Sequence, residues 1–276
     1  MHNLDTILLF KEALYGALLI AVACSALGVY VVLRRIVFVG AALAQLSSAG
    51  IALGLFLGGL GATAGLATHP IAMSLVATMA GAVFFGLGGG KHRIPPDATI
   101  GVTYVVAAAA GILLIAKAVT GEAHDIFLQG NILGITLGDS WVLLAVAIPV
   151  LVLHLIVYKE FLFVSFDGET AHTLGYNVTF WNLLLYATLG LVIAFAMQFA
   201  GVMLVFDFLV LPAVTGMLVA QSMRGTFVIA IGSAVIAAIV GFSLSVPFDL
   251  PTGPAMIACS GALVLFAWLI RLMQRR

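Results

Sequence analysis

The sequence predicts an all-α protein, a polytopic bundle of about eight or nine transmembrane helices. Of the 276 residues, 63% are hydrophobic and only 8% are charged, whereas an ordinary soluble domain has about a quarter charged residues. Mean hydropathy is +1.25. The apolar residues form runs of about 20, the length that crosses a bilayer as a helix. We therefore expect residues 1–276 to form a single transmembrane domain.

Nine apolar runs fit this length and define the candidate spans. In chain order they are residues 12–33, 40–60, 70–90, 97–118, 139–160, 178–199, 200–222, 226–246 and 252–273. The sixth and seventh spans adjoin, so Gln198 and Gly201 must make a very tight turn, and one of these two spans could be a broken or re-entrant helix.

Basic residues test this count, because Lys and Arg concentrate in cytoplasmic loops. With nine crossings, one side of the membrane receives Arg34, Arg35, Lys91, Arg93, Lys159, Arg224, Arg271, Arg275 and Arg276. Lys11 and Lys117 are exceptions at outer ends, from which a long side chain can reach the headgroups. The N-terminus is therefore expected outside and the C-terminus in the cytoplasm.

A glycine-rich segment, FGLGGGKH (residues 85–92), approaches the phosphate-binding loop G-x-x-x-x-G-K-[ST]. Phe85 stands in place of the first glycine and His92 in place of the Ser or Thr. We therefore expect this chain to bind no nucleotide or other cofactor and to be no enzyme. If ATP is used, a separate subunit binds it with magnesium and hydrolyses it.

The longest polar cytoplasmic segment, KEFLFVSFDGETAHTLGYN, runs from Lys159 to Asn177. Within it Asp167 can cap a short helix carrying Glu169, His172 and Leu174, and Gly175 can end that helix. A solvated loop helix is the plainer interpretation. A short helix parallel to the membrane is also what a partner protein could bind.

Asp207 is the one acidic residue well inside a candidate span, in GVMLVFDFLVLPAVTG. Intramembrane carboxylates usually face a bundle interior or a transport pathway. A hydrogen-bonded acid that ties two helices together is the structural alternative. An aspartyl protease would pair Asp207 with Asp249, but Asp249 lies at an outer turn. Pro212 follows closely and can break the span, exposing carbonyls to a cavity.

Several segments, read in order, resemble the membrane permeases of the zinc, manganese and iron family of ATP-binding-cassette importers. They are LGVYVVLRRIVFVGAALAQ (27–45), PDATIGVTY (96–104), HDIFLQGNILGI (124–135), FLFVSFDGETAHTLGYN (161–177), AMQFAGVMLVFDFLVLPAVTGML (196–218) and FDLPTGP (248–254). Their order and spacing match over nearly the whole chain.

The resemblance implies a homodimer in a bacterial inner membrane, with the translocation path on its two-fold axis. It also implies two cytoplasmic ATPase subunits and an extracytoplasmic substrate-binding protein, with no role for nucleic acid. Residues 161–177 become the coupling segment, whose ATPase-facing residues would be Asp167, Glu169, His172, Leu174 and Gly175. Candidate pathway residues are Gln45, Ser47, Ser48, Met203 and Asp207, with Asp207 as the candidate metal ligand.

The chain departs from this family where G-D-A-x-x-H is typical. Gly40 is present, but Ala41 replaces the Asp and Gln45 replaces the His. An Asp and a His one helical turn apart can bind a divalent cation, whereas alanine supplies no donor and a neutral amide is a weak ligand. We hypothesise that Asp207, on a neighbouring helix, supplies the anionic group in place of the missing Asp.

A divalent metal is the favoured substrate, and two alternatives stay open. In one, the importer carries a neutral or chelated solute, with Gln45, Ser47 and Ser48 as hydrogen-bonding groups. In the other, the chain is an ion-gradient-driven carrier that uses Asp207 as a proton site and needs no ATP.

Overall fold

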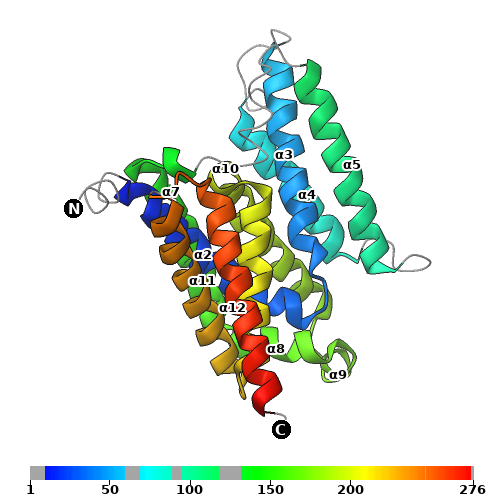
Figure 1. Cartoon of the computed structure of the whole chain (residues 1–276). Helices are drawn as coiled ribbons and strands as arrows, with labels where there is room; N and C mark the ends of the chain where they lie inside the picture. Colours follow the sequence, from blue (N-terminus) through cyan, green and yellow to red (C-terminus); the bar gives the residue numbers. More distant parts are fainter. Residues whose placement is uncertain (1–9, 60–68, 89–94, 118–131, 246, 275–276) are drawn as a thin grey trace.

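The computed structural model describes residues 10–59, 69–88, 95–117, 132–245 and 247–274. Every regular element in these ranges is a helix (Figure 1). The elements are α2 (Lys11–Leu33), α3 (Phe38–Gly59), α4 (Pro70–Gly86), α5 (Pro96–Lys117), η2 (Ile132–Gly134), α7 (Leu137–Ile156), α8 (Tyr158–Phe166), α9 (Gly168–Thr173), α10 (Val178–Val219), α11 (Met223–Ser245) and α12 (Thr252–Gln274).

Seven of the described helices are long and apolar enough to cross a membrane: α2, α3, α5, α7, α10, α11 and α12. At 17 residues α4 is shorter and reaches about 26 Å, slightly less than a hydrocarbon core of about 30 Å. The all-α class with multiple apolar spans is therefore confirmed. The count of nine spans and the orientation of the termini stay predictions.

The 42-residue helix α10 reverses direction at Gly201, the tight turn expected from the sequence. Gly201 has φ 73° and ψ 168°, a backbone conformation that glycine adopts without steric penalty. Near the beginning of α10, Asn182 accepts a hydrogen bond from Arg34, which directly follows α2. Near its end, Ala213 packs on Val29 in the last turns of α2. Both ends of α10 thus lie beside the same end of α2.

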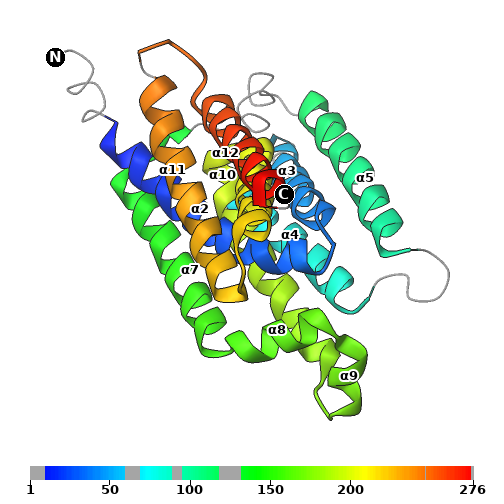
Figure 2. The same ribbon diagram turned by 60° about the horizontal axis from the view of Figure 1, so that its bottom comes forward.

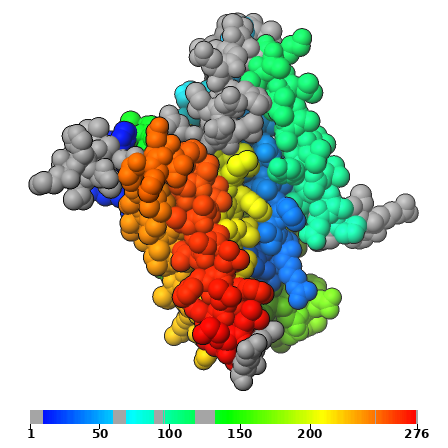
Figure 3. Space-filling view, in the orientation of Figure 1, coloured from blue at the N-terminus to red at the C-terminus, as the bar shows by residue number. Residues whose placement is uncertain are grey.

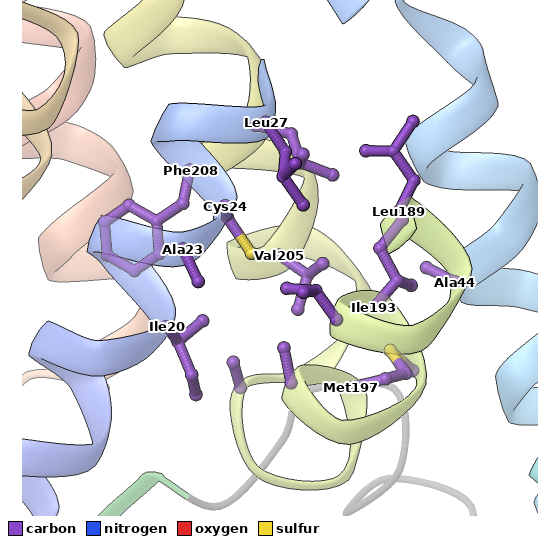
Figure 4. Close-up of a cluster of buried hydrophobic side chains, with 14 of the residues drawn as sticks. Ile20, Ala23, Cys24, Leu27, Ala44, Leu189, Ile193, Met197, Val205 and Phe208 are labelled. Carbon is purple, nitrogen blue, oxygen red and sulfur yellow. The ribbon is translucent and has the colours of Figure 1, made fainter. Parts of the chain in front are cut away.

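The buried core gathers around α2 and the two halves of α10. Most of its side chains are small or aliphatic, with a few aromatic rings among them, and helices in such a core approach closely because packing drives their association in lipid. Figure 4 shows part of this cluster, with Ile20, Ala23, Cys24, Leu27, Ala44, Leu189, Ile193, Met197, Val205 and Phe208 labelled. Outside this core, α3 packs mainly against α4 and α5, and α12 packs against α10 and α11.

Most of the described basic residues lie at one end of the bundle. There the ring of Tyr158 in α8 meets Phe227 in α11 at 5.6 Å. Helix α12 returns to the same end, because its beginning lies beside the end of α11, where Ser245 is 3.5 Å from Thr252. Arg34 and Arg35 follow α2, Lys159 lies in the first turn of α8, Arg224 in the first turn of α11, and Arg271 in the last turn of α12. Lys91, Arg93, Arg275 and Arg276 lie outside the described residues, as do residues 89–92 of FGLGGGKH and 124–131 of HDIFLQGNILGI.

Candidate functional site

Helices α8 and α9 project from the basic end of the bundle (Figure 2). Asp167 is the N-cap of α9, and its carboxylate accepts hydrogen bonds from the Thr170 amide at 2.9 Å and the Thr170 hydroxyl at 2.5 Å. Gly175, with φ 87°, lies just beyond the helix. The short capped helix expected from the sequence is therefore confirmed.

The surface of α9 and the residues after it is almost entirely exposed. Ala171 alone is buried, so it holds the helix against the protein. All five residues expected to face an ATPase are exposed or at the exposed turn: Asp167, Glu169, His172, Leu174 and Gly175. Leu174 is 66% exposed, and the nearby Phe166 is 60% exposed, so this segment presents large apolar side chains at the surface.

The hydrogen bonds from Thr170 hold the pKa of Asp167 below its ordinary value of 3.8. A lowered folded-state pKa means that the capping interaction stabilises α9 above pH 3.8 and is lost as pH falls through the lowered pKa. We expect carboxyl-carbon NMR to give a titration midpoint below 3.8, and Thr170→Val to raise it, because the largest contribution is the hydroxyl hydrogen bond. An unchanged midpoint in Thr170→Val would contradict this assignment.

Helix α8 is fixed to the bundle by an aromatic cluster. Phe161 is fully buried and stacks on His154 of α7 at 4.3 Å between ring centroids. It also contacts Tyr30 of α2 and Trp181 of α10. Four helices therefore meet at this side chain. We expect α8 to move together with α2, α7 and α10, and α9 to extend outward from this packed cluster.

Arg34 makes a second attachment between α8 and the bundle. Its Nε donates to Ser165 Oγ in α8 at 2.8 Å, and its Nη1 donates to Asn182 Oδ1 in α10 at 2.5 Å. Burial lowers the pKa of Arg34 to about 10, so the guanidinium stays protonated at neutral pH. From the sequence, Arg34 is predicted only as a cytoplasmic charge. Its partners Ser165 and Asn182 are distant in sequence, and no local motif indicates that they bind it.

A groove between α3, α5 and α10 contains Ala41, the position where the resemblance leads one to expect an Asp. In Figure 3 a strip of α10 is visible between α12 and α3, with α5 beyond it. The groove encloses about 510 Å³ and is lined by Phe38, Ala41, Asp97, Gly101, Tyr104, Val105, Val202, Met203 and Phe206. Met203 also lines a neighbouring cavity of about 450 Å³, next to residues 251–254 of FDLPTGP.

The other candidate pathway residues on α3 are buried within the protein. Ser47 is fully buried and shares a 2.7 Å hydrogen bond with Ser74 of α4. Gln45 and Ser48 are 7% and 5% exposed. Among the described residues, no group of three or more His, Cys, Asp or Glu side chains could hold a metal ion. Their roles in the pathway stay predictions.

Asp207 lies in the contact between α10 and α12. It is buried, and its Oδ2 accepts a hydrogen bond from Ser260 at 2.8 Å. Its Oδ1 has no partner in the described part of the chain. This position favours the structural alternative, an acid that ties two helices together, because the groove beside Ala41 is lined by Met203 and Phe206 of the same helix instead.

We expect Asp207→Asn to fold and to transport like the wild type, because an amide oxygen still accepts the Ser260 hydrogen bond. Asp207→Leu should lower the free energy of unfolding by about 1 to 3 kcal/mol, since the buried Ser260 hydroxyl loses its acceptor. Thermal unfolding in detergent and uptake by proteoliposomes measure the two effects. A well-folded Asp207→Asn that has lost uptake would instead make Asp207 a pathway residue.

Comparisons with known proteins match nearly the full chain. Residues 6–271 match the family described as "ABC 3 transport family". The manganese transport system membrane protein MntC of Listeria monocytogenes is 31% identical over 261 residues, covering 94% of this chain and 89% of that protein. The manganese import system permease protein ScaB of Streptococcus gordonii is 31% identical over 267 residues, covering 96% and 92%. Among solved structures, PsaBC from Streptococcus pneumoniae in complex with Fab has a TM-score of 0.83 and 26% identity, covering 97% of this chain and 94% of that one.

Proposed function

Because this chain belongs to the ABC 3 transport family, we propose that it is the membrane permease of an ATP-driven importer of a divalent metal cation such as manganese, zinc or iron. It is a multi-pass protein of the bacterial cytoplasmic membrane. The similarity to two manganese permeases along more than nine-tenths of the chain carries this proposal. The exposed, capped helix α9 supports it as well, because a permease driven by a separate ATPase needs a surface that binds the ATPase.

We propose nine crossings within a single transmembrane domain of residues 1–276, with the N-terminus outside and the C-terminus in the cytoplasm. The reversal at Gly201 supports counting α10 as two crossings. The cations at the end bearing α8 and α9 support a cytoplasmic position for that end, by the distribution of Lys and Arg in membrane proteins.

The translocation path would lie between two copies of the chain. The groove beside Ala41 is open along one side of the protein, and an ion crossing the membrane needs a path closed off from lipid. A second copy covering the face of α3, α5 and α10 would close it and present each lining residue twice, as two-fold symmetry requires. Met203, 69% exposed and shared by both cavities, is then the candidate pathway residue with the most access.

Two ATPase subunits would bind α9 and the turn after it, and ATP with magnesium would bind to them and not to this chain. An extracytoplasmic substrate-binding protein would deliver the cation at the opposite end. Residues 251–254, which line the cavity next to Met203, lie at that end and are suited to receive it.

Proteoliposomes test the proposal. We expect uptake of manganese, zinc or iron(II) only when the ATPase subunit, the binding protein and ATP are all present. Uptake by this chain alone, driven by a proton gradient, would establish the secondary carrier instead. ATP-driven uptake of a chelate or neutral solute, with no uptake of the free ions, would replace the metal with the other substrate class. Positions 41 and 45 carry Ala and Gln in place of the Asp and His of the family pattern. For this reason chelated and neutral solutes should be tested in the same preparation.

A further inference from the structure

Arg34 joins three parts of the chain at the basic end of the bundle. It directly follows α2, and its guanidinium donates to Ser165 in α8 and to Asn182 in α10. Residues 34, 165 and 182 are far apart in sequence, so this junction exists only in the folded chain. The third nitrogen, Nη2, is buried and has no hydrogen-bond partner in the described ranges. The two hydrogen bonds therefore have to hold this charged group in place.

The geometry of the junction requires an arginine. A guanidinium presents its N–H groups in a rigid planar fork and can donate to two acceptors at once, whereas an ammonium is a single point on a flexible stem. Here the two acceptors lie on different helices, one on each side of the fork. A displacement of Ser165 is therefore expected to move Arg34, and through it Asn182.

The first half of α10, which contains Asn182, connects this junction to the groove. The first half of α10 runs from Asn182 to the reversal at Gly201, and Val202 and Met203 directly after it line the groove with Ala41. Packed helices act as rigid bodies on this scale, because interiors have few voids and transmit displacement. On the other side of Arg34, α8 continues into Asp167 and the exposed helix α9.

We propose that Arg34 is a positioning residue that transmits movement of the coupling segment to α10 and so links ATP hydrolysis to opening of the translocation path. This inference rests on the proposed function, since it needs an ATPase acting on α9. Arg34 does not contact the transported ion. Together with the contact between Phe161 and Trp181, it keeps α8 and α10 in a fixed relation when the ATPase moves α9.

The readout is the amount of ion taken up per ATP hydrolysed by the complete transporter in proteoliposomes, with manganese as the probe ion. We expect Arg34→Gln to bind the ATPase and hydrolyse ATP, but to take up about tenfold less ion per ATP, within the range of coupling between distant sites. Arg35→Gln is the matched control. It removes the same charge from the adjacent, exposed residue and should leave the ratio unchanged.

Variants of the two acceptors make the test independent of any folding defect in Arg34→Gln. Ser165→Ala and Asn182→Leu each remove one acceptor and should each lower the ratio, whereas Asn182→Asp keeps an acceptor and should preserve it. The double variant Asn182→Leu with Arg34→Gln should take up as much ion per ATP as Arg34→Gln alone, because both changes break the same interaction.

An unchanged ratio in Arg34→Gln, or in both Ser165→Ala and Asn182→Leu, would overturn the inference. So would an equal loss in Arg35→Gln, which would indicate a general effect of charge. These outcomes differ from a failure of the proposed function, in which the wild-type chain would itself show no ATP-driven uptake.

Discussion

Leu174→Asp is expected to abolish ATP-driven uptake while the chain still folds and inserts. Leu174 is 66% exposed and follows α9, which projects from the bundle. If the ATPase covers Leu174, Leu174→Asp places an unpaired charge in the interface, which costs about 2 to 5 kcal/mol of binding. That loss corresponds to a weakening of the ATPase complex by about 30-fold or more.

Co-purification of the ATPase subunit with the detergent-solubilised chain measures this effect. Leu174→Met is the matched control, because it keeps an apolar side chain of similar volume and should retain the ATPase. Glu169→Arg, a charge reversal on the same exposed helix, should also weaken the complex. A Leu174→Asp chain that retains the ATPase and transports normally would remove the coupling role from residues 161–177.

Gly28→Ala is expected to destabilise the folded chain strongly. A Cβ atom at Gly28 would lie 1.9 Å from the carbonyl oxygen of Leu209 and 2.7 Å from its carbonyl carbon. These are backbone atoms of α10, so no side-chain rotation relieves the clash, and α2 must separate from α10. Because the buried core is built on this contact, we expect a loss of about 3 kcal/mol or more in the free energy of unfolding.

The control for this prediction is Gly261→Ala in α12, where a Cβ would meet nothing within 4 Å. Alanine is the better helix former, so this variant should be as stable as the wild type or gain up to about 1 kcal/mol. Thermal unfolding of the purified chains in detergent compares the two. Equal melting temperatures for both variants would show that α2 and α10 do not pack as closely as described.

Local features of this protein could be predicted from its sequence. The spans follow from the length of apolar runs, and the reversal in α10 follows from Gly201 between two of them. The capped helix α9 follows from Asp167 and Gly175, because capping involves residues only a few positions apart. Each of these features is determined by residues that are close together in the sequence.

Contacts between distant segments could not be predicted. The hydrogen bonds Arg34–Ser165, Ser47–Ser74 and Asp207–Ser260 depend on how each helix is rotated about its axis. The spans are apolar on nearly all sides, so hydrophobic periodicity does not reveal that rotation. For this reason the sequence alone does not predict that Ser47 and Asp207 each form a hydrogen bond to a neighbouring helix, and their pathway roles stay predictions.

Ala41 shows how the sequence and the structure complement each other. The family resemblance leads one to expect a metal-binding Asp at this position, and the structure places Ala41 in the groove with Asp97 and Tyr104 of α5. A metal ion following this groove would meet oxygen donors on α5 in place of a carboxylate on α3. Oxygen donors suit manganese better than they suit softer ions.

ATP hydrolysis by the assembled complex, measured with and without added metal ion, tests the proposed function most directly. We predict that manganese, zinc or iron(II), presented with the substrate-binding protein, stimulates hydrolysis by the wild-type complex and not by the Leu174→Asp preparation. Hydrolysis that does not respond to any of the three ions would contradict the assignment of this chain as a permease for divalent metal.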